Sequence, residues 1–324
     1  MHSIDFYRTA FISYLKEKTQ ANDPPNLYEP IAYILGLGGK RLRPVLTLMA
    51  TEIFDTDHKQ ALNAALAIEV FHNFSLVHDD IMDAAPLRRG AATVHEKWDV
   101  NTGILSGDAM LITAYQFFEN YEPKKFRNLA QLFSTTALQV CEGQQYDIDF
   151  ENRDDVTLPE YLKMIRSKTA VLVAAALKMG GIIAEAPVVD QNKIYDFGLN
   201  LGIAFQLQDD YLDAFGDPKT FGKQVGGDII ENKKTVLYLN VLENGTDLQR
   251  KELLDMYSIQ PKDPSAKIET IKGIFLESGA AESTLTAIAE YTDKAFGVLD
   301  ELDISKDKKE VLRSFGEQLM GREV

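Results

Sequence analysis

Apolar residues recur at steps of three and four along almost the whole chain of 324 residues, and sustained two-residue alternation is hard to find. Steps of three and four place apolar side chains on one face of an α-helix, whereas alternation is typical of β-strands. The sequence therefore predicts an all-α fold with about ten or more helices, since helices of ~11 residues are usual. Helix breaks are expected where Pro, Gly and polar residues gather, at 22–25, 36–39, 85–86, 122–123, 151–155, 215–227, 243–246 and 260–264.

Two of the expected helices are informative. Residues 61–82 form a long and strongly apolar run, typical of a helix that is buried on most sides at the centre of a bundle. Thr157, Pro159 and Glu160 together form a helix-start signature, and the run after them continues to about Gly180. No Pro-, Gly- or Ser-rich linker interrupts the chain, so we expect residues 1–324 to form a single domain.

The charge of the chain limits its partners. The formal net charge is −15, so the overall field repels nucleic acid and anionic membranes, and an anionic substrate needs local cations. The most apolar stretch, 170–184, contains Lys178 and is shorter than the roughly 20 residues that span a bilayer, so no membrane insertion is expected. Cys141 is the only cysteine, and a lone buried thiol in a cytoplasmic protein is the expectation.

The pattern DDxxD occurs twice, 130 residues apart. Each copy follows an apolar stretch, residues 71–78 in one case and 201–208 in the other. On a helix the first and last aspartates share one face, where they repel each other unless a cation lies between them. Carboxylates without His or Cys at matching spacing select Mg²⁺ or Ca²⁺. An EF-hand calcium loop is excluded, because neither cluster has the glycine and the distal glutamate of that loop. One copy alone could be a solvated helix end. Two copies favour a metal site of six carboxylates: Asp79, Asp80, Asp83, Asp209, Asp210 and Asp213.

Basic residues accompany these clusters. Gly38 and Gly39 are expected to end a helix, and Lys40 and Arg43 lie three apart, which would place them on one face of the next turn. Taken singly, each basic residue is more often a solvated surface charge. In so acidic a chain they together indicate a bound diphosphate. The other members of the set are Arg88, Arg89, Lys168, Lys223 and Lys233.

Three stretches resemble the signature regions of the trans-polyprenyl diphosphate synthases, the farnesyl and geranylgeranyl diphosphate synthase family. They are GGKRLRP, DDIMD with its trailing LRRG, and FQLQDDYLD, and the resemblance spans about Gly38 to Lys233. It implies an isoprenoid-synthase helical bundle with a central active-site cavity. It also implies a homodimer that condenses isopentenyl diphosphate with an allylic diphosphate, with Mg²⁺ as cofactor and three ions present when substrate is bound.

The resemblance also implies a role for each motif residue. Asp79, Asp83 and Asp209 would hold Mg²⁺, and the other three aspartates would complete its shell. Arg88, Lys168, Lys223 and Lys233 would bond the allylic diphosphate. Isopentenyl diphosphate would be held by four residues: Lys40, Arg43, His72 and Arg89. The carbonyl dipoles around Lys168 and Thr169, together with Gln206, would steady the allylic cation.

Product length is expected to depend on Phe74, five residues before Asp79, and on the smaller Ser75. In the family that this chain resembles, a large residue at the position of Phe74 accompanies short products, which suggests C15 to C20, with geranylgeranyl ahead of farnesyl diphosphate. His78 is expected to be structural.

Two other functions remain open. A class I terpene cyclase would share the fold and the first aspartate cluster, but the intact second cluster argues against it. A non-catalytic subunit of a heteromeric synthase is disfavoured because every motif residue is present.

Overall fold

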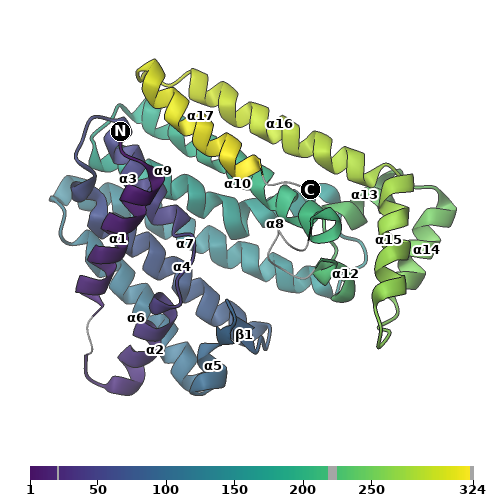
Figure 1. Ribbon diagram of the computed structural model, residues 1–324. Helices are drawn as coiled ribbons and strands as arrows, with labels where there is room; N and C mark the ends of the chain where they lie inside the picture. The colour runs from purple at the N-terminus through teal and green to yellow at the C-terminus, as the bar shows by residue number, and fades with distance from the viewer. Residues whose placement is uncertain (20–21, 218–224, 322–324) are drawn as a thin grey trace. The chain divides into compact units, whose positions relative to one another are not determined.

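The protein is described by a computed structural model that covers residues 1–19, 22–217 and 225–321 (Figure 1). These residues form helices joined by short loops and one two-stranded hairpin. The predicted all-α fold is confirmed. Within the described ranges, every helix is too short or too polar to cross a membrane.

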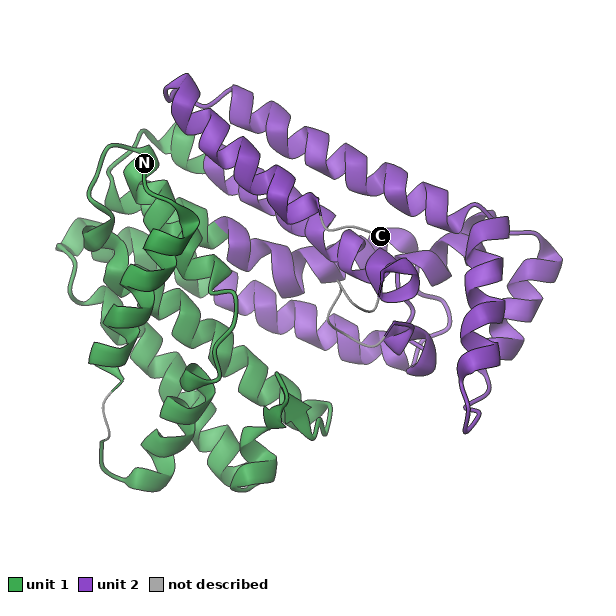
Figure 2. Ribbon diagram, in the orientation of Figure 1, with its two compact units in different colours: residues 1–135, 175–192 green, residues 136–174, 193–324 purple. Residues whose placement is uncertain are grey.

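The chain divides into two compact units (Figure 2). Unit 1 consists of Met1–Thr135 and Ala175–Asn192, and unit 2 of Thr136–Ala174 and Lys193–Val324. Three helices contribute residues to both units: α7 (Pro123–Glu151), α9 (Val171–Ile183) and α10 (Val188–Phe215). The single domain expected from the absence of a linker stays a prediction.

Unit 1 is built around helix α4. Residues 64–71 of α4 are all buried, as expected for the apolar run at 61–82, and the helix packs against α3 and α6. Besides its parts of α7, α9 and α10, the unit contains α1 (Ile4–Lys18), α2 (Pro25–Gly36), α3 (Leu42–Ile53), η1 (His58–Ala61), α4 (Leu62–Met82), β1 (Leu87–Arg88), β2 (Ala91–Ala92), α5 (Val94–Lys97) and α6 (Val100–Phe118).

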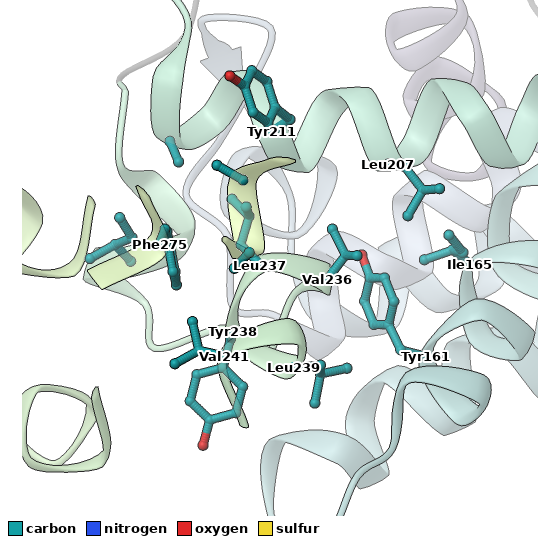
Figure 3. Packing of buried hydrophobic residues seen from close by; sticks show 14 of the residues in the cluster. Tyr161, Ile165, Leu207, Tyr211, Val236, Leu237, Tyr238, Leu239, Val241 and Phe275 are labelled. Atoms are coloured by element: carbon teal, nitrogen blue, oxygen red, sulfur yellow. The ribbon is translucent and has the colours of Figure 1, made fainter. Parts of the chain in front are cut away.

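Unit 2 surrounds a core of buried apolar side chains that includes Tyr161, Leu207, Val236 and Phe275 (Figure 3). Besides its parts of the three shared helices, the unit contains α8 (Leu158–Ile165), η2 (Arg166–Ala170), α12 (Gly227–Ile230), α13 (Val236–Asn244), α14 (Asp247–Tyr257), α15 (Ser265–Glu277), α16 (Ala280–Asp300) and α17 (Lys306–Met320).

Most predicted breaks coincide with helix ends, and Thr157 with Glu160 forms the predicted capping box of α8. The break after α3 was not predicted. There the chain turns at Asp55, whose φ is +60°, and Asp tolerates this left-handed conformation without the Gly or Pro that marks a turn in a sequence.

The burial expected for Cys141 is wrong, because its position on α7 is exposed. The pKa of its thiol is nevertheless raised, by partial burial and then by Glu142, which disfavours a reactive thiolate.

Candidate active site

The first aspartate cluster occupies the C-terminal end of α4 in unit 1. Asp83 caps the helix, and its N–H donates to the carbonyl of Asp79 at 2.9 Å. Asp79 and Asp83 therefore lie one turn apart on one face, as predicted. Asp80 lies about 100° round the helix and is only 1% exposed. Two of the three carboxylates thus share a face, and the third points into the unit.

Arg88 compensates the buried carboxylate of Asp80. Its Nε lies 2.8 Å from each carboxylate oxygen of Asp80, and its Nη2 lies 2.7 Å from Oδ1. The same Nη2 lies 3.5 Å from Oδ2 of Asp79. Burial raises the pKa of Asp80, and the bonds from Arg88 oppose that rise without cancelling it. The structure thus brings Arg88 to the first cluster, and its bond to the allylic diphosphate stays a prediction.

Arg89 reaches the glycine pair through a tight hairpin. Strands β1 and β2 are joined by Arg89 and Gly90, whose φ values are +54° and +77°, as in the two-residue turns that match strand twist. The Arg89 guanidinium donates to the carbonyl of Gly38. Gly39 has a φ of +122°, which other residues rarely adopt, and a Cβ there would lie 2.9 Å from Cζ of Arg89, so glycine suits both the backbone and this approach. Two motifs that are 50 residues apart in sequence therefore meet here.

Positive charge surrounds His72 on α4. Its pKa lies well below the usual value, because of burial first and then the charges of Arg43, Arg89, Arg88 and Arg41. Burial likewise lowers the pKa of Arg43 to about 10, and Arg43 Nε is buried without a hydrogen-bond partner among the described residues. His72 is thus a neutral histidine among arginines, and the buried Nε of Arg43 is available as a hydrogen-bond donor. Such a combination favours the binding of an anion.

One of these arginines has an internal partner. Arg41 Nη1 lies 2.5 Å from Oε1 of buried Glu69, and its Nη2 donates to the carbonyl of Leu35. Arg41 takes a φ of +50° as the N-cap of α3, which begins only at Leu42. The shared helical face predicted for Lys40 and Arg43 is therefore wrong: exposed Lys40 precedes the helix, and the left-handed residue between them redirects the chain.

The proposed chain-length residues lie on α4, before the cluster. Phe74 is 8% exposed, and its ring centroid lies 5.5 Å from that of Phe71 and 4.8 Å from that of His78. Ser75 is half-buried and donates to the carbonyl of His72 at 2.8 Å. His78 contacts the carbonyl of Ile104 through Nε2 at 3.2 Å, which is consistent with the structural role expected for it.

The second cluster lies on α10 in unit 2, where Asp209 and Asp213 again share a face. The Asp210 carboxylate accepts hydrogen bonds from the Tyr161 hydroxyl and, at 3.3 Å, from Gln206 Nε2. Burial raises the pKa of Asp210 to about 8, and the charge of Asp228 adds to the effect. Repulsion between buried carboxylates of this kind is relieved by a bound cation.

Asp228 links the second cluster to a lysine. Its N–H donates to Oδ2 of Asp213 at 2.9 Å, and its Oδ1 lies 3.5 Å from Nζ of Lys233. Lys233 also pairs with Glu231 at 2.7 Å, and its pKa is raised because these acidic partners outweigh the effect of burial. The structure thus places Lys233 beside the second cluster, whereas Lys223 lies outside the described residues.

Lys168 and half-buried Thr169 lie on a π-helical turn. In η2 the N–H of Val171 donates to the carbonyl of Arg166, five residues earlier, and π turns are frequent at functional sites. Lys168 Nζ donates to Asp147. Two glycines make room for the turn: a Cβ on Gly143 would lie 2.2 Å from the Lys168 nitrogen, and one on Gly202 would lie 2.9 Å from Cα of Ala170.

Several residues of the site were missed in the sequence: Tyr161, Asp228, Asp147, Gly143 and Gly202. For the glycines a signal existed, because an isolated glycine in the middle of a long helix has a helix-forming cost that usually reflects a close contact. For Tyr161, Asp147 and Asp228 no local signal existed, since their roles arise from the folding of distant segments onto one another.

The donor set of each cluster fits magnesium. Both clusters offer hard carboxylate oxygens, and the pKa of Asp210 is raised by burial first and then by the charge of Asp228. In unit 1, the first cluster lies on the same helix as His72, and the arginines around His72 provide a setting for an anion. A divalent cation and a diphosphate are the pair that these residues fit.

Comparison with known proteins agrees with this reading. The family model for polyprenyl synthetase matches residues 24–274, more than half of the chain. The chain belongs to the polyprenyl synthetase family. A crystal structure of a geranylgeranyl pyrophosphate synthase matches this polyprenyl synthetase with a TM-score of 0.96 and 56% identity, covering 100% of both chains.

Two relatives are similar over most of their length. A geranylgeranyl diphosphate synthase from Methanosarcina mazei is 34% identical over 93% of this chain and 91% of its own. A geranylfarnesyl diphosphate synthase from Natronomonas pharaonis is 37% identical over 83% of this chain and 82% of its own. The predicted family and enzyme class, a polyprenyl diphosphate synthase, are thereby confirmed.

Proposed function

We propose that this polyprenyl synthetase condenses isopentenyl diphosphate with dimethylallyl, geranyl and farnesyl diphosphates, and that its main product is geranylgeranyl or farnesyl diphosphate. The observation that carries the proposal is the arginine cluster around neutral His72, on the same helix as Asp79 and Asp83. His72 precedes Asp79 by seven residues, which is two helical turns, so both lie on one face of α4. An anion site and a cation site adjoin there, as a magnesium diphosphate requires.

The motif residues divide between the two substrates. Asp79, Asp83 and Asp209 hold Mg²⁺ on the allylic diphosphate, and Asp80, Asp210 and Asp213 complete its shell. The allylic group is also bonded by three basic side chains at described positions, Arg88, Lys168 and Lys233, and by Lys223. Isopentenyl diphosphate is held by Lys40, Arg43, His72 and Arg89. The bare Nε of Arg43 and the neutral ring of His72 support this assignment.

The reaction breaks the allylic C–O bond and forms a C–C bond. Mg²⁺ held by the aspartates, as three ions with substrate bound, would supply positive charge that stabilises the departing diphosphate. Arg88, Lys168 and Lys233 add charge-assisted hydrogen bonds to the same oxygens. The π turn presents carbonyl dipoles at Lys168 and Thr169, and Gln206 adds its amide, so that these groups steady the allylic cation. The double bond of isopentenyl diphosphate attacks that cation, and the final proton passes to the released diphosphate.

Product length follows from Phe74. Its buried ring, packed on Phe71 and His78, lies one turn before the first cluster, where a growing chain that runs back along α4 would end. Ser75 beside it is too small to block the chain. The related enzymes are a geranylgeranyl and a geranylfarnesyl diphosphate synthase, so the family makes both C20 and longer products.

We also propose that the enzyme is a cytoplasmic homodimer whose residues 1–324 act as one domain. Support comes from exposed apolar side chains on α6, among them Ile104, Leu105 and Ile112, which are 41%, 60% and 60% exposed. Exposed apolar side chains on one helix are typical of a subunit interface. Sedimentation analysis tests this directly, because a monomer at micromolar concentration would refute it.

The experiment that tests the function is a product assay with Mg²⁺, isopentenyl diphosphate and each of the C5, C10 and C15 allylic diphosphates. Extended linear diphosphates are expected. Cyclic hydrocarbons would instead identify a class I terpene cyclase, and no turnover with any primer would favour a non-catalytic subunit of a heteromeric synthase.

A further inference from the structure

Two histidines and a glutamate converge in unit 1 at a place the prenyl transfer reaction does not use. Nδ1 of His58 lies 2.7 Å from Oε1 of Glu52, and Nδ1 of His2 lies 3.0 Å from the same oxygen. The three ligand atoms all lie within 4.8 Å of one another. Residue 2 precedes α1, Glu52 lies in the last turn of α3, and His58 begins η1. We call this group the His2–Glu52–His58 cluster.

Packing fixes both imidazole rings. The His58 side chain is only 6% exposed, and its ring lies edge-on to Phe6 at 5.3 Å and to Tyr7 at 5.8 Å between centroids. The His2 ring stacks on Phe6 at 3.9 Å with an interplanar angle of 10°. The His58 ring is therefore held in place by packing and the His2 ring is oriented by stacking before any ligand arrives, which reduces the entropy lost on binding.

The carboxylate of Glu52 is oriented and ionised. Tyr7 donates its hydroxyl to Oε2 at 2.6 Å, and Oε1 faces the two histidines, although Nδ1 of His2 also lies 3.1 Å from Oε2. Burial by itself raises the pKa of Glu52, but hydrogen bonds from Tyr7, His2 and His58 outweigh it, so the pKa is lowered. Glu52 also lies at the C-terminal end of α3, where the helix dipole favours a cation.

We propose that His2, Glu52 and His58 bind one divalent ion of the zinc class, which fastens residue 2 to α3 and η1. Two imidazole nitrogens and one carboxylate oxygen form a donor set that suits Zn²⁺ and leaves one coordination position for water. Donor atoms around tetrahedral Zn²⁺ lie about 3.3 Å apart, given bonds of about 2.0–2.1 Å. The observed separations of 2.7 and 3.0 Å need to widen by only a few tenths of an ångström.

Without an ion, Nδ1–H of each imidazole donates to Oε1 of Glu52. Binding moves that proton to Nε2, so that the lone pair of Nδ1 faces the ion. Oδ1 of Asp57 lies 3.4 Å from Nδ1 of His58 and adds negative charge at the same point. Tyr7 then orients the carboxylate ligand without touching the ion, as outer partners of metal sites do.

The test is a calorimetric titration of the untagged protein, residues 1–324, with Zn²⁺. The buffer contains millimolar Mg²⁺, which occupies the aspartate clusters. Weak binding of Zn²⁺ to those aspartates then does not contribute to the titration. One ion per chain is expected. The chief variant is His2→Ala, because the exposed ring of His2 can be removed without leaving a cavity in the core. The matched control is Lys59→Ala, which changes an exposed side chain next to His58. We expect His2→Ala to weaken binding by at least about tenfold, in the range seen when metal sites lose supporting groups.

Two further measurements keep the proposal falsifiable. Zn²⁺ should raise the Tm of the parent and of Lys59→Ala but not of His2→Ala, because an ion that binds only the folded chain stabilises it. Co²⁺ should give the visible absorption of a tetrahedral site, and that absorption should be lost in His2→Ala. Absence of Zn²⁺ binding, or equal binding by the parent and His2→Ala, would overturn the proposal and leave the cluster as a purely hydrogen-bonded one.

Discussion

His72 is a half-buried histidine that remains neutral among arginines, and this makes stability depend on pH. Its folded-state pKa lies well below that of a free histidine, because of burial first and then the charges of Arg43 and Arg89. As pH falls below the unfolded pKa of about 6.5, the unfolded chain binds a proton that the folded chain does not, so stability decreases.

Between pH 7.5 and pH 5.5 the free energy of unfolding should decrease by up to about 1.4 kcal/mol, given a pKa of roughly 6.5 for histidine in the unfolded chain. In His72→Gln that part of the acid sensitivity should disappear, and urea unfolding at the two pH values measures it. An equal loss of stability in the parent and the variant would show that His72 titrates normally in the folded protein.

Phe74 is the residue on which product length should depend. Replacement by Ala removes the ring that closes the path along α4, and products made from farnesyl and isopentenyl diphosphates should lengthen by at least one isoprene unit. Chromatography of the dephosphorylated products measures the shift. The loss of a buried ring can cost about 3–5 kcal/mol, so Phe74→Leu serves as a milder variant with an intermediate shift.

Ser75→Ala is the control, because it removes a hydroxyl that donates only to the His72 carbonyl and leaves the side-chain volume nearly unchanged. Its product distribution should match that of the parent. If Phe74→Ala remained folded and still made products of the parental length, Phe74 would not form the pocket floor.

At the scale of elements, the π turn η2 depends on close contact with α7 and α10. A Cβ on Gly143 would lie 2.2 Å from a backbone nitrogen, which cannot move as a flexible side chain can. Gly143→Ala should therefore displace Lys168 and Thr169, destabilise the protein by about 1–3 kcal/mol and lower kcat.

Gly273 on α15 provides the matched control, since a Cβ there meets nothing within 4 Å. Gly273→Ala should stabilise the protein by about 0.5–1 kcal/mol, because alanine loses less backbone entropy in a helix. Thermal unfolding and steady-state kinetics on both variants separate the effects. A Gly143→Ala protein with parental Tm and kcat would show that the π turn tolerates the added methyl group.

For the whole molecule, the proposed function couples two clusters to one ligand. Mg²⁺ with inorganic diphosphate should raise the stability of the protein, by about 2.7 kcal/mol when the ligand is present at about 100 times its Kd. Asp79→Asn and Asp209→Asn should each abolish most of this gain, since both aspartates are proposed to act on one diphosphate. Chelation of the metal should abolish it in the parent.

A protein that carries both Asp79→Asn and Asp209→Asn distinguishes one shared diphosphate site from two independent sites. Loss of one shared site makes the effects of the two substitutions non-additive, whereas independent sites give effects that add. Differential scanning fluorimetry on the four proteins measures this, and simple additivity would contradict a shared diphosphate.

Local patterns were sufficient to predict the helical fold, the capping box of α8 and the shared face of Asp79 and Asp83, whereas the family followed from the order of three motifs along the chain. The first three depend on residues within a few turns of one another, where helix geometry alone relates sequence to space. The same kind of reasoning failed for Lys40 and Arg43, because the left-handed conformation of Arg41 accompanies its pairing with Glu69, 28 residues away.

The sequence by itself determined that this chain folds into helices, carries two aspartate clusters and belongs with the prenyl synthases, since spacing and motif order are properties of the chain alone. Only the tertiary structure decided the pairing of Arg88 with Asp80 and the room that Gly143 makes for the π turn. It also decided the convergence of His2 and His58 on Glu52. These contacts join segments that are distant in sequence or lie in separate elements, so they follow from packing, which no local pattern records.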